Sequence, residues 1–482
     1  MLELTGFGCR APGRLRAVDD LTLTADSGSI TAVVGRSGSG GATLVRTLAG
    51  AVNTGRTRGT ATLNGRRIDG ATRDELAAAV LWISDDALPG GTVADCLRIL
   101  TGNVSAAEGL GLDADLDRRL SSLPIDLRLR LHCASLLPRT GTTAASLVLV
   151  DRVMGAGDVS TRDRFCSLLR ERARDGAAVL WAEHDLDAVW EHADHVVELD
   201  GGRLAWQGRP DQWQPRTLPE PTLLTLARAL DVPPADCRTP KQTAQALETS
   251  AIVLPLFPHR SADGASPAGS GAVIDATAVG LSGPAIEIRP GECLGIIDTS
   301  GRPEALARRL IAKLPGGDVV PSQLPVTLRL DAAARTWERR HHLPAGSVLA
   351  HLPTLRPRAL LLDLSPGELA LFRLALAGGP TTPLWLSHPQ AGLDPRERHT
   401  LAEDLRRRPA GTRLVTSRDI EFLVRACHRL VVVSHDVVIA DGSPSAVADL
   451  LPSAPLVSRA VGSTRYLRLS DVLSTTQATV NA

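Results

Sequence analysis

Short apolar runs alternate with charged, helix-like stretches through most of this chain. The apolar runs Ser29–Gly35, Ser146–Asp151 and Ala177–Glu183 each have the length of a single strand. The stretch Ser160–Gly176, which lies between the last two, carries charged residues at the spacing of a helix. Continuous apolar strands separated by helices are typical of a mostly parallel sheet with helices on both faces. We therefore expect an α/β fold.

The sequence also resembles itself across its two halves. One pair of similar segments aligns through Gly208 and Gly442, which stand 234 residues apart. An earlier pair places Trp82 opposite Trp337, at a spacing of 255 residues. A spacing that shrinks slowly along the chain indicates two homologous halves, with deletions in the second.

A segment rich in Pro, Gly, Ser and Ala separates the two halves. This composition is typical of a flexible linker, and it covers residues 251–272. We expect a first domain at 1–250 and a second, more divergent domain at 273–482. A length of 482 residues also favours two domains over one.

Charge and composition narrow the function classes. Lys plus Arg equals Asp plus Glu, at 53 each, so nucleic acid is not expected as a partner. The sequence has no run of about 20 apolar residues that would span a membrane and no secretion-signal pattern at its start, so we expect a cytoplasmic chain. The seven cysteines show no C-x-x-C spacing and are expected to be reduced, mostly buried thiols.

A glycine-rich loop follows the first apolar run and precedes a helical pattern. This order of strand, loop and helix is that of a phosphate-binding loop, whose backbone N–H groups hold phosphate oxygens. The motif G-x-x-x-x-G-K-[ST] requires Lys and Ser/Thr where this chain has Gly41 and Ala42. A glycine-rich turn without a ligand therefore stays an open alternative. The candidate nucleotide-binding residues of this segment are Gly35, Arg36, Ser37, Gly38, Ser39, Gly40, Gly41, Ala42 and Thr43.

The ordered motifs of the first half resemble those of ABC ATPases. The resemblance assigns Asp151 to magnesium binding, places Arg152 where the catalytic glutamate stands, and identifies His184 as a candidate switch histidine. Asp85 replaces the Q-loop glutamine, and LSSLP at residues 120–124 stands in for the signature LSGGQ. No residue is therefore assigned a catalytic role. Arg152 is a candidate cation for a γ-phosphate, with a surface arginine in an empty site as the alternative.

The second half keeps a different subset of the family's motifs. LSPGE at Leu364–Glu368 is close to the signature, and Pro389–Asp394 resembles an intact D-loop. The phosphate loop has Glu304 and Ala305 at the two motif positions, so a triphosphate would be repelled there. Further replaced positions are Arg340 for the Q-loop glutamine, Ser387 and His388 for the Walker B pair, and Arg418 for the switch histidine.

The resemblance implies two P-loop NTPase domains of the ABC type in tandem, each with a helical subdomain. Since ATP in this family lies between the phosphate loop of one domain and the signature of the other, the first composite site would add Ser365, Gly367 and Asp394 from the second half. We expect weak binding of ATP and Mg²⁺ at this site only, and poor or absent hydrolysis, because a lost catalytic base costs about 10²–10⁴ in rate.

A finer resemblance is to the fused ATPases of energy-coupling-factor importers, which move vitamins and metal ions. It rests on the segment Thr416–Val433, on a helical extension from about Pro219 to Leu247, and on the counterpart of this extension after Pro455. It implies an ATP-binding subunit that works with membrane-embedded transporter subunits on separate chains, at the inner face of the cell membrane. The alternative is a catalytically dead pseudoenzyme that acts as structural or regulatory partner of an active ABC ATPase or of a membrane subunit. A tandem ABC protein of ribosomes or DNA is disfavoured by the neutral charge.

Overall fold

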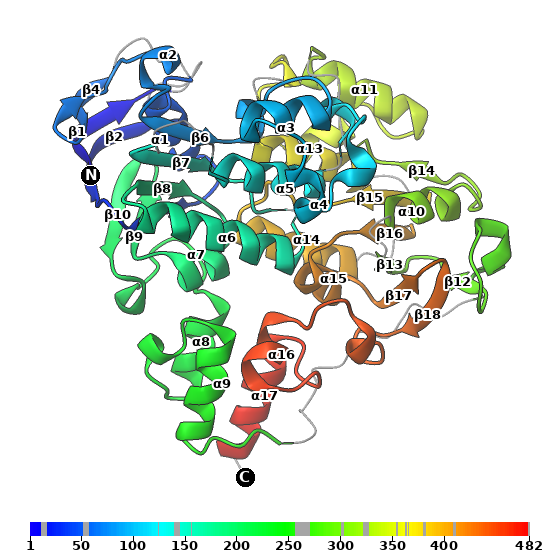
Figure 1. Ribbon diagram of the computed structural model, residues 1–482. Helices are drawn as coiled ribbons and strands as arrows, with labels where there is room; N and C mark the ends of the chain where they lie inside the picture. Colours follow the sequence, from blue (N-terminus) through cyan, green and yellow to red (C-terminus); the bar gives the residue numbers. More distant parts are fainter. Residues whose placement is uncertain are drawn as a thin grey trace. The chain divides into compact units, whose positions relative to one another are not determined.

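The protein forms two compact units, Met1–Pro221 and Thr222–Ala482, in a computed structural model (Figure 1). The described residues are 1–10, 17–51, 57–123, 125–138, 145–155, 157–255, 270–299, 303–321, 327–352, 355–361, 364, 366–378, 382–407 and 411–480.

The first unit contains an antiparallel sheet and a mostly parallel sheet. Among the described residues the antiparallel sheet has four strands in the order β2-β1-β4-β5, and the parallel sheet has six in the order β10-β9-β3-β8-β7-β6. In the described residues of the six-stranded sheet, the one antiparallel pairing is that of β9 with β10. The strands are β1 (Leu2–Cys9), β2 (Val18–Ala25), β3 (Ile30–Gly35), β4 (Arg58–Leu63), β5 (Arg66–Arg67), β6 (Val80–Ile83), β7 (Leu147–Asp151), β8 (Ala178–Ala182), β9 (His195–Asp200) and β10 (Arg203–Gly208).

Helices cover both faces of the parallel sheet. Every residue of β3, β7 and β8 is buried, which explains why these strands read as continuous apolar runs. Alternate residues enter two separate cores, so Val34 packs on one face with Phe165 while Val33 packs on the other with Leu44. The helices of this unit are α1 (Gly41–Leu48), α2 (Arg73–Leu76), α3 (Val93–Thr101), α4 (Ala106–Leu110), α5 (Ile125–Leu136), α6 (Val159–Arg174) and α7 (Leu186–His192).

The second unit repeats this strand order. Its six-stranded sheet runs β14-β15-β16-β13-β17-β18, and each strand takes the place of its counterpart in β6-β7-β8-β3-β9-β10. A two-stranded sheet, β11-β12, is the other one found in the described part of this unit. The strands are β11 (Ala272–Ile274), β12 (Ile286–Ile288), β13 (Cys293–Asp298), β14 (Asp318–Val319), β15 (Leu384–Ser387), β16 (Arg413–Thr416), β17 (Arg429–Ser434) and β18 (Val437–Gly442). The predicted α/β class and the tandem ABC-type arrangement of strands are confirmed.

Ten helices are described in the second unit, and four of them form a separate helical module. We use this name for α8, α9, α16 and α17, which lie side by side in Figure 1. The helices are α8 (Thr222–Ala229), α9 (Pro240–Thr249), α10 (Pro303–Ile311), α11 (Leu330–Arg340), α12 (Ser347–Ala350), α13 (Pro366–Gly378), α14 (Pro395–Arg407), α15 (Ile420–Ala426), α16 (Leu456–Val461) and α17 (Leu469–Val480).

Apolar side chains and one hydrogen bond hold the helical module together. Ala227, Val232 and Leu247 form a buried cluster that also contacts Val461. The hydroxyl of Tyr466 donates a hydrogen bond of 2.7 Å to the carbonyl oxygen of Pro255. Helices α8 and α9, which the sequence analysis placed in a first domain ending at residue 250, therefore pack with the C-terminal helices in the second compact unit.

The structure also bears on the cysteines, the linker and the absence of a membrane-spanning run that the sequence predicts. All seven cysteines lie in described residues, are buried and carry free thiols, as predicted. Most of the predicted linker, 256–269, lies outside the described residues. The domain limits at 250 and 273 stay a prediction. Among the described residues, no helix has both the length and the apolar composition that crossing a membrane requires.

Candidate phosphate-binding site

The glycine-rich loop keeps the backbone shape that a phosphate cradle needs. It joins β3 to α1 and has positive φ at Gly38 (85°) and at Gly40 (106°), which is the residue before the helix. A Cβ atom at Gly40 would lie 2.1 Å from the carbonyl oxygen of Ala17, so only glycine fits there. The loop residues therefore present the N-terminus of α1 as the predicted motif does.

Glycine is not required at the lysine position of the motif. A Cβ atom at Gly41 would lie 3.5 Å from Val33 Cγ1 and 3.8 Å from Ala182 Cβ, which are ordinary van der Waals distances. The backbone φ of Gly41 is not positive. The missing lysine is thus a loss of chemistry that the local backbone does not impose.

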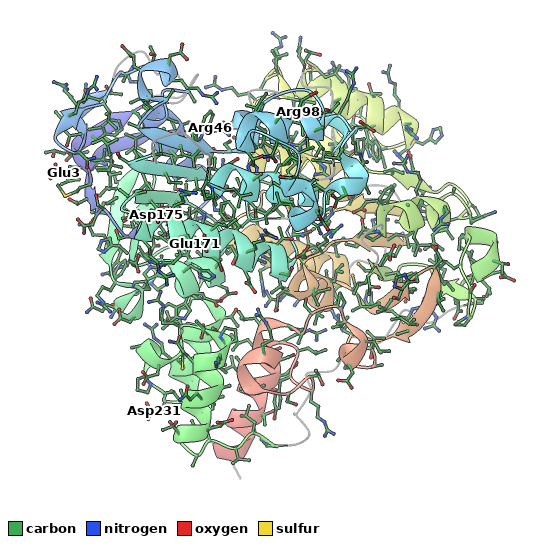
Figure 2. The ribbon with its side chains drawn as sticks, in the orientation of Figure 1. Glu3, Arg46, Arg98, Glu171, Asp175 and Asp231 are labelled. Atoms are coloured by element: carbon green, nitrogen blue, oxygen red, sulfur yellow. The ribbon has the colours of Figure 1, made fainter. Side chains whose placement is uncertain are left out.

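Two arginines contact the carboxylate that the sequence analysis assigned to magnesium. Asp151 ends β7, and its side chain is only 1% exposed. Arg46, which comes from α1 and is labelled in Figure 2, donates from Nε to Asp151 Oδ2 at 2.7 Å. Arg152 donates from Nε to Asp151 Oδ1 at 3.2 Å. Each carboxylate oxygen therefore already has a guanidinium partner.

Arg152 also contacts the candidate switch histidine. Its backbone φ is 48°, and its N–H donates 2.9 Å to the carbonyl of Ala182 in the next strand. The guanidinium Nη1 lies 3.3 Å from His184 Nε2. A guanidinium only donates hydrogen bonds, so this contact requires His184 Nε2 to accept and its ring to be neutral. The structure thus brings Asp151, Arg152 and His184 together.

One of the two acidic residues of the Q-loop segment contacts the same arginine of α1. Asp86 Oδ2 lies 3.0 Å from Arg46 Nη2. Asp85, at the position of the Q-loop glutamine, instead contacts His132 Nε2 at 2.9 Å and Arg128 Nη1 at 3.3 Å. The sequence analysis missed the contact of Arg46 with Asp86. The only signal available was its place on the helix that follows the loop.

These residues do not fit a magnesium ion as they are arranged. A P-loop holds Mg²⁺ with the Ser/Thr hydroxyl after the lysine and the Walker B aspartate. Ala42 has no hydroxyl, and both oxygens of Asp151 are engaged by arginine. Magnesium binding at Asp151, as predicted from the sequence, would require one of these ion pairs to open.

The second unit carries the reverse exchange of charges at its own loop. Residues 300–302 of this loop lie outside the described residues. Glu304, at the lysine position, contacts His388 Nε2 at 3.1 Å, and His388 stands at the position of the catalytic glutamate. Burial favours the neutral acid, but the hydrogen bond and charge of His388 outweigh it and lower the pKa of Glu304.

His388 and Arg152 are structural counterparts. His388 has a φ of 46° and donates its backbone N–H to the carbonyl of Thr416 in the next strand at 2.8 Å. Arg152 has the same left-handed conformation and the same cross-strand bond. Both units therefore place a basic side chain where the family has its catalytic carboxylate.

The signature residues of the second half are only partly described. Ser365 lies outside the described residues, and Gly367 lies in the first turn of α13. Asp394 caps α14, because its Oδ1 accepts the N–H of Glu397 at 2.9 Å. Asp158 caps α6 in the same way in the first unit, since its Oδ1 accepts the N–H of Thr161 at 2.7 Å. A structural role as a helix cap thus accounts for Asp394, and its predicted part in a composite site stays a prediction.

Two sequence alignments were wrong in the helical subdomains. Trp82 lies on β6, but Trp337 lies in α11. The residue before α3 and the residue before α11, Thr92 and Arg329, each form an isolated β-bridge, which makes these two helices counterparts. Arg340 at the end of α11 is therefore not the Q-loop position. That position follows β14, where residues 322–326 lie outside the described residues.

The signature of the first half is also displaced by three residues. Helix α5 begins at Ile125, and α13 begins at Pro366 within LSPGE. Alignment of these two helix starts places Leu123–Leu127, with the sequence LPIDL, at the signature position instead of LSSLP at 120–124. The motif is therefore more degenerate in the first half than the sequence analysis supposed.

Comparison with known proteins identifies the family. A family model described as ABC transporter matches residues 18–130. A hemin import ATP-binding protein, HmuV, of Bradyrhizobium diazoefficiens is 31% identical over 212 residues, which cover 41% of this chain and 78% of that protein. The aliphatic sulfonates import ATP-binding protein SsuB 2 of Nocardia farcinica is 32% identical over 249 residues, covering 50% of this chain and 96% of that protein.

One solved structure is similar in fold to both units of this chain. A chain in a model of ribosome-bound archaeal Pelota and ABCE1 has a TM-score of 0.61, covering 92% of this chain and 80% of that chain. Its sequence identity is 18%, so this likeness concerns the fold alone. The shared strand order, the loop geometry and the similarity to import ATP-binding proteins lead to one conclusion: this chain belongs to the family of ABC transporter ATP-binding proteins.

Proposed function

We infer that this chain is the ATP-binding subunit of an ABC importer of the energy-coupling-factor type, with vitamins or metal ions as transported substrates. It would work with membrane-embedded subunits on separate chains, at the inner face of the cell membrane. The relatives named above are import ATP-binding proteins, which supports the importer role. The ATP would bind weakly, at the first composite site, and hydrolysis would be slow or absent.

The expectation of slow or absent hydrolysis rests on Arg152. Arg152 occupies the position of the catalytic glutamate and is itself bound to Asp151 and His184. No carboxylate is left there to orient the attacking water, and this loss alone costs about 10²–10⁴ in rate. The missing lysine at Gly41 adds to that loss.

The test is a titration of ATP into the purified full-length chain together with a turnover assay. We expect one ATP per chain and a turnover below about 0.1 s⁻¹, given common enzyme values of about 1–10³ s⁻¹ and the lost base. Two bound ATP molecules per chain with ordinary turnover would contradict the proposal.

A cavity beside the Q-loop segment supports docking of a membrane subunit. It has a volume of about 430 Å³ and is lined by residues including Trp82, Asp86, Leu88 and Ile99. The side chain of Ile99 is 52% exposed, which is uncommon for an isoleucine of a helix in a folded unit. An apolar cavity with a charged edge suits a short amphipathic helix of a partner. In ABC transporters the coupling helix of the membrane subunit lies beside the Q-loop.

We expect Ile99→Asp to release the chain from the membrane fraction of its native host. A buried charge opposite an apolar partner helix would cost more than about 1–2 kcal/mol, which removes at least about tenfold of the binding. Leu204→Asp is the matched control, because Leu204 is a 37% exposed apolar residue on β10. Quantitative immunoblots of membrane and soluble fractions measure the effect. Equal release by both variants, or by neither, would argue against this docking site.

A second candidate function is a pseudoenzyme that pairs with an active ABC ATPase. The contact of Glu304 with His388 favours it, since it places a carboxylate of the chain itself at the lysine position of the second motif. Such a protein would bind a permease or an active ATPase without any ATP dependence. Comparison of complex formation with and without ATP separates the two functions.

A further inference from the structure

Two guanidinium groups contact Asp151, the residue that the family uses to bind its metal ion. Arg46 and Arg152 pair with different oxygens of this carboxylate, at 2.7 Å and 3.2 Å. Burial opposes the charge on Arg46, but Asp151 and Asp86 outweigh it and raise the pKa of the guanidinium, which stays charged. The site therefore holds two permanent positive charges beside the phosphate loop.

Arginine side chains supply positive charge where the intact motif has a metal ion. There, a lysine and Mg²⁺ face an aspartate and a glutamate, which leaves one net positive charge. Here, Arg46 and Arg152 face Asp151, which leaves one positive charge, and the pair of Arg46 with Asp86 at 3.0 Å offsets it. The side chain of Asp86 is 62% exposed, so water screens this pair more than the two pairs with Asp151, whose side chain is 1% exposed.

The two arginines are also placed to change partners. Their side chains are 29% and 16% exposed, so neither is sealed in the core. Arg152 Nη1 donates one hydrogen bond to the neutral ring of His184, which is a weaker acceptor than a phosphate oxygen. A guanidinium binds phosphate with paired N–H groups, and the eight-residue helix α1 directs its N-terminal N–H groups at the same ligand.

We propose that the first phosphate loop binds the phosphates of a nucleotide without a divalent cation, with Arg46 and Arg152 as the counter-charges. The proposal rests on the nucleotide-binding role given above. It accounts in one arrangement for Gly41, Ala42 and Arg152, which otherwise are three unrelated losses. It also explains why the loop keeps its glycines although the motif's lysine and hydroxyl are gone.

The first experiment compares ATP binding to the full-length chain in Mg²⁺ and in EDTA by calorimetry. We expect dissociation constants within about twofold of each other, whereas an ABC site that depends on magnesium would weaken at least about tenfold in EDTA. No variant is needed, so this result does not depend on the folding of a mutant.

Three variants locate the effect. Arg152→Gln should weaken binding in EDTA by about tenfold to a hundredfold, the usual range for one charge-assisted contact. Asp151→Asn should strengthen binding in EDTA by about tenfold, because it releases two guanidinium groups from a competing carboxylate. Arg98→Gln is the matched control and should change nothing, because Arg98, labelled in Figure 2, is exposed on α3 and among the described residues its ion pair is the one with Asp95.

The outcomes separate this inference from the proposed function. ATP binding that appears only with Mg²⁺ and is lost in Asp151→Asn would overturn the inference and leave the importer role intact. No ATP binding in either buffer would overturn both the inference and the ATP-binding part of the proposed function. Unchanged binding by Arg152→Gln in EDTA would remove Arg152 from the site and overturn the inference as stated.

Discussion

The triple variant Gly41→Lys, Ala42→Ser, Arg152→Glu is expected to hydrolyse ATP at least about 10²-fold faster than the natural sequence, with a requirement for Mg²⁺. The lysine and the hydroxyl restore the contacts to the phosphates and to the metal. The glutamate restores the base, and its introduction releases Oδ1 of Asp151 from Arg152. The backbone already has the necessary shape, because Cβ at residue 41 meets only ordinary contacts at 3.5 Å and 3.8 Å.

The matched control keeps Arg152. The double variant Gly41→Lys, Ala42→Ser should bind ATP but turn it over as slowly as the natural sequence, since no base is present. Steady-state phosphate release, measured at saturating ATP for both variants, distinguishes a binding defect from a catalytic one. A triple variant that binds ATP and remains as slow as the double variant would mean that something other than the lost base limits hydrolysis. The degenerate second site is the first alternative to examine in that case.

The variant Arg429→Met is expected to lower the free energy of unfolding of the second unit by about 3–5 kcal/mol. Arg429 pairs with Glu292, whose side chain is 0% exposed, through Nε at 2.9 Å. Loss of the arginine leaves a buried carboxylate without its countercharge, which is far more costly than loss of an exposed ion pair. Hydrogen exchange of peptides from β13 and β17, read by mass spectrometry, reports the second unit separately from the first.

Two comparisons test the cause of that instability. Arg289→Met removes an arginine whose ion pair with Glu287 is about one-third exposed, and should cost less than about 1 kcal/mol. The double variant Arg429→Met, Glu292→Met should recover part of the loss, because the buried charge of Glu292 is gone while Asp441, the second partner of Arg429 at 3.0 Å, stays without it. Equal destabilisation by the single and double variants would assign the effect to lost packing of Arg429 and not to the buried charge.

The central sheets could be predicted from the sequence because burial on both faces leaves a continuous apolar run. This applies to β3, β7 and β8, whose residues are all buried. It fails for β14, which has only the two residues Asp318 and Val319 and carries no apolar pattern. Without that strand as a marker, the alignment matched the tryptophan of β6 to one in α11, and the Q-loop position shifted with it.

The part of the site next to the strands could be predicted from the sequence, but the contacts between residues far apart in the sequence could not. Asp151, Arg152 and His184 follow apolar strands, so their positions at the edge of a parallel sheet could be read from the sequence. The contact of Arg46 with Asp151 joins residues 105 positions apart and belongs to no motif. The pairing of Glu304 with His388 spans 84 positions, and each residue alone looks like a lost ligand. Charge exchange between distant positions leaves no local pattern that one sequence can show.

The helical module has a consequence for how the two halves of the chain stay associated. Helices α8 and α9 follow the first unit directly, yet their apolar contacts and the bond from Tyr466 to Pro255 lie in the second. A chain cut anywhere between residues 256 and 269 would still keep the first unit joined to α8 and α9, and these would still pack on α16 and α17. The packing of α8 and α9 on α16 and α17 then sets the effective concentration of one half of the chain around the other. This helical contact links the two parts of the chain whether or not a phosphate loop binds nucleotide.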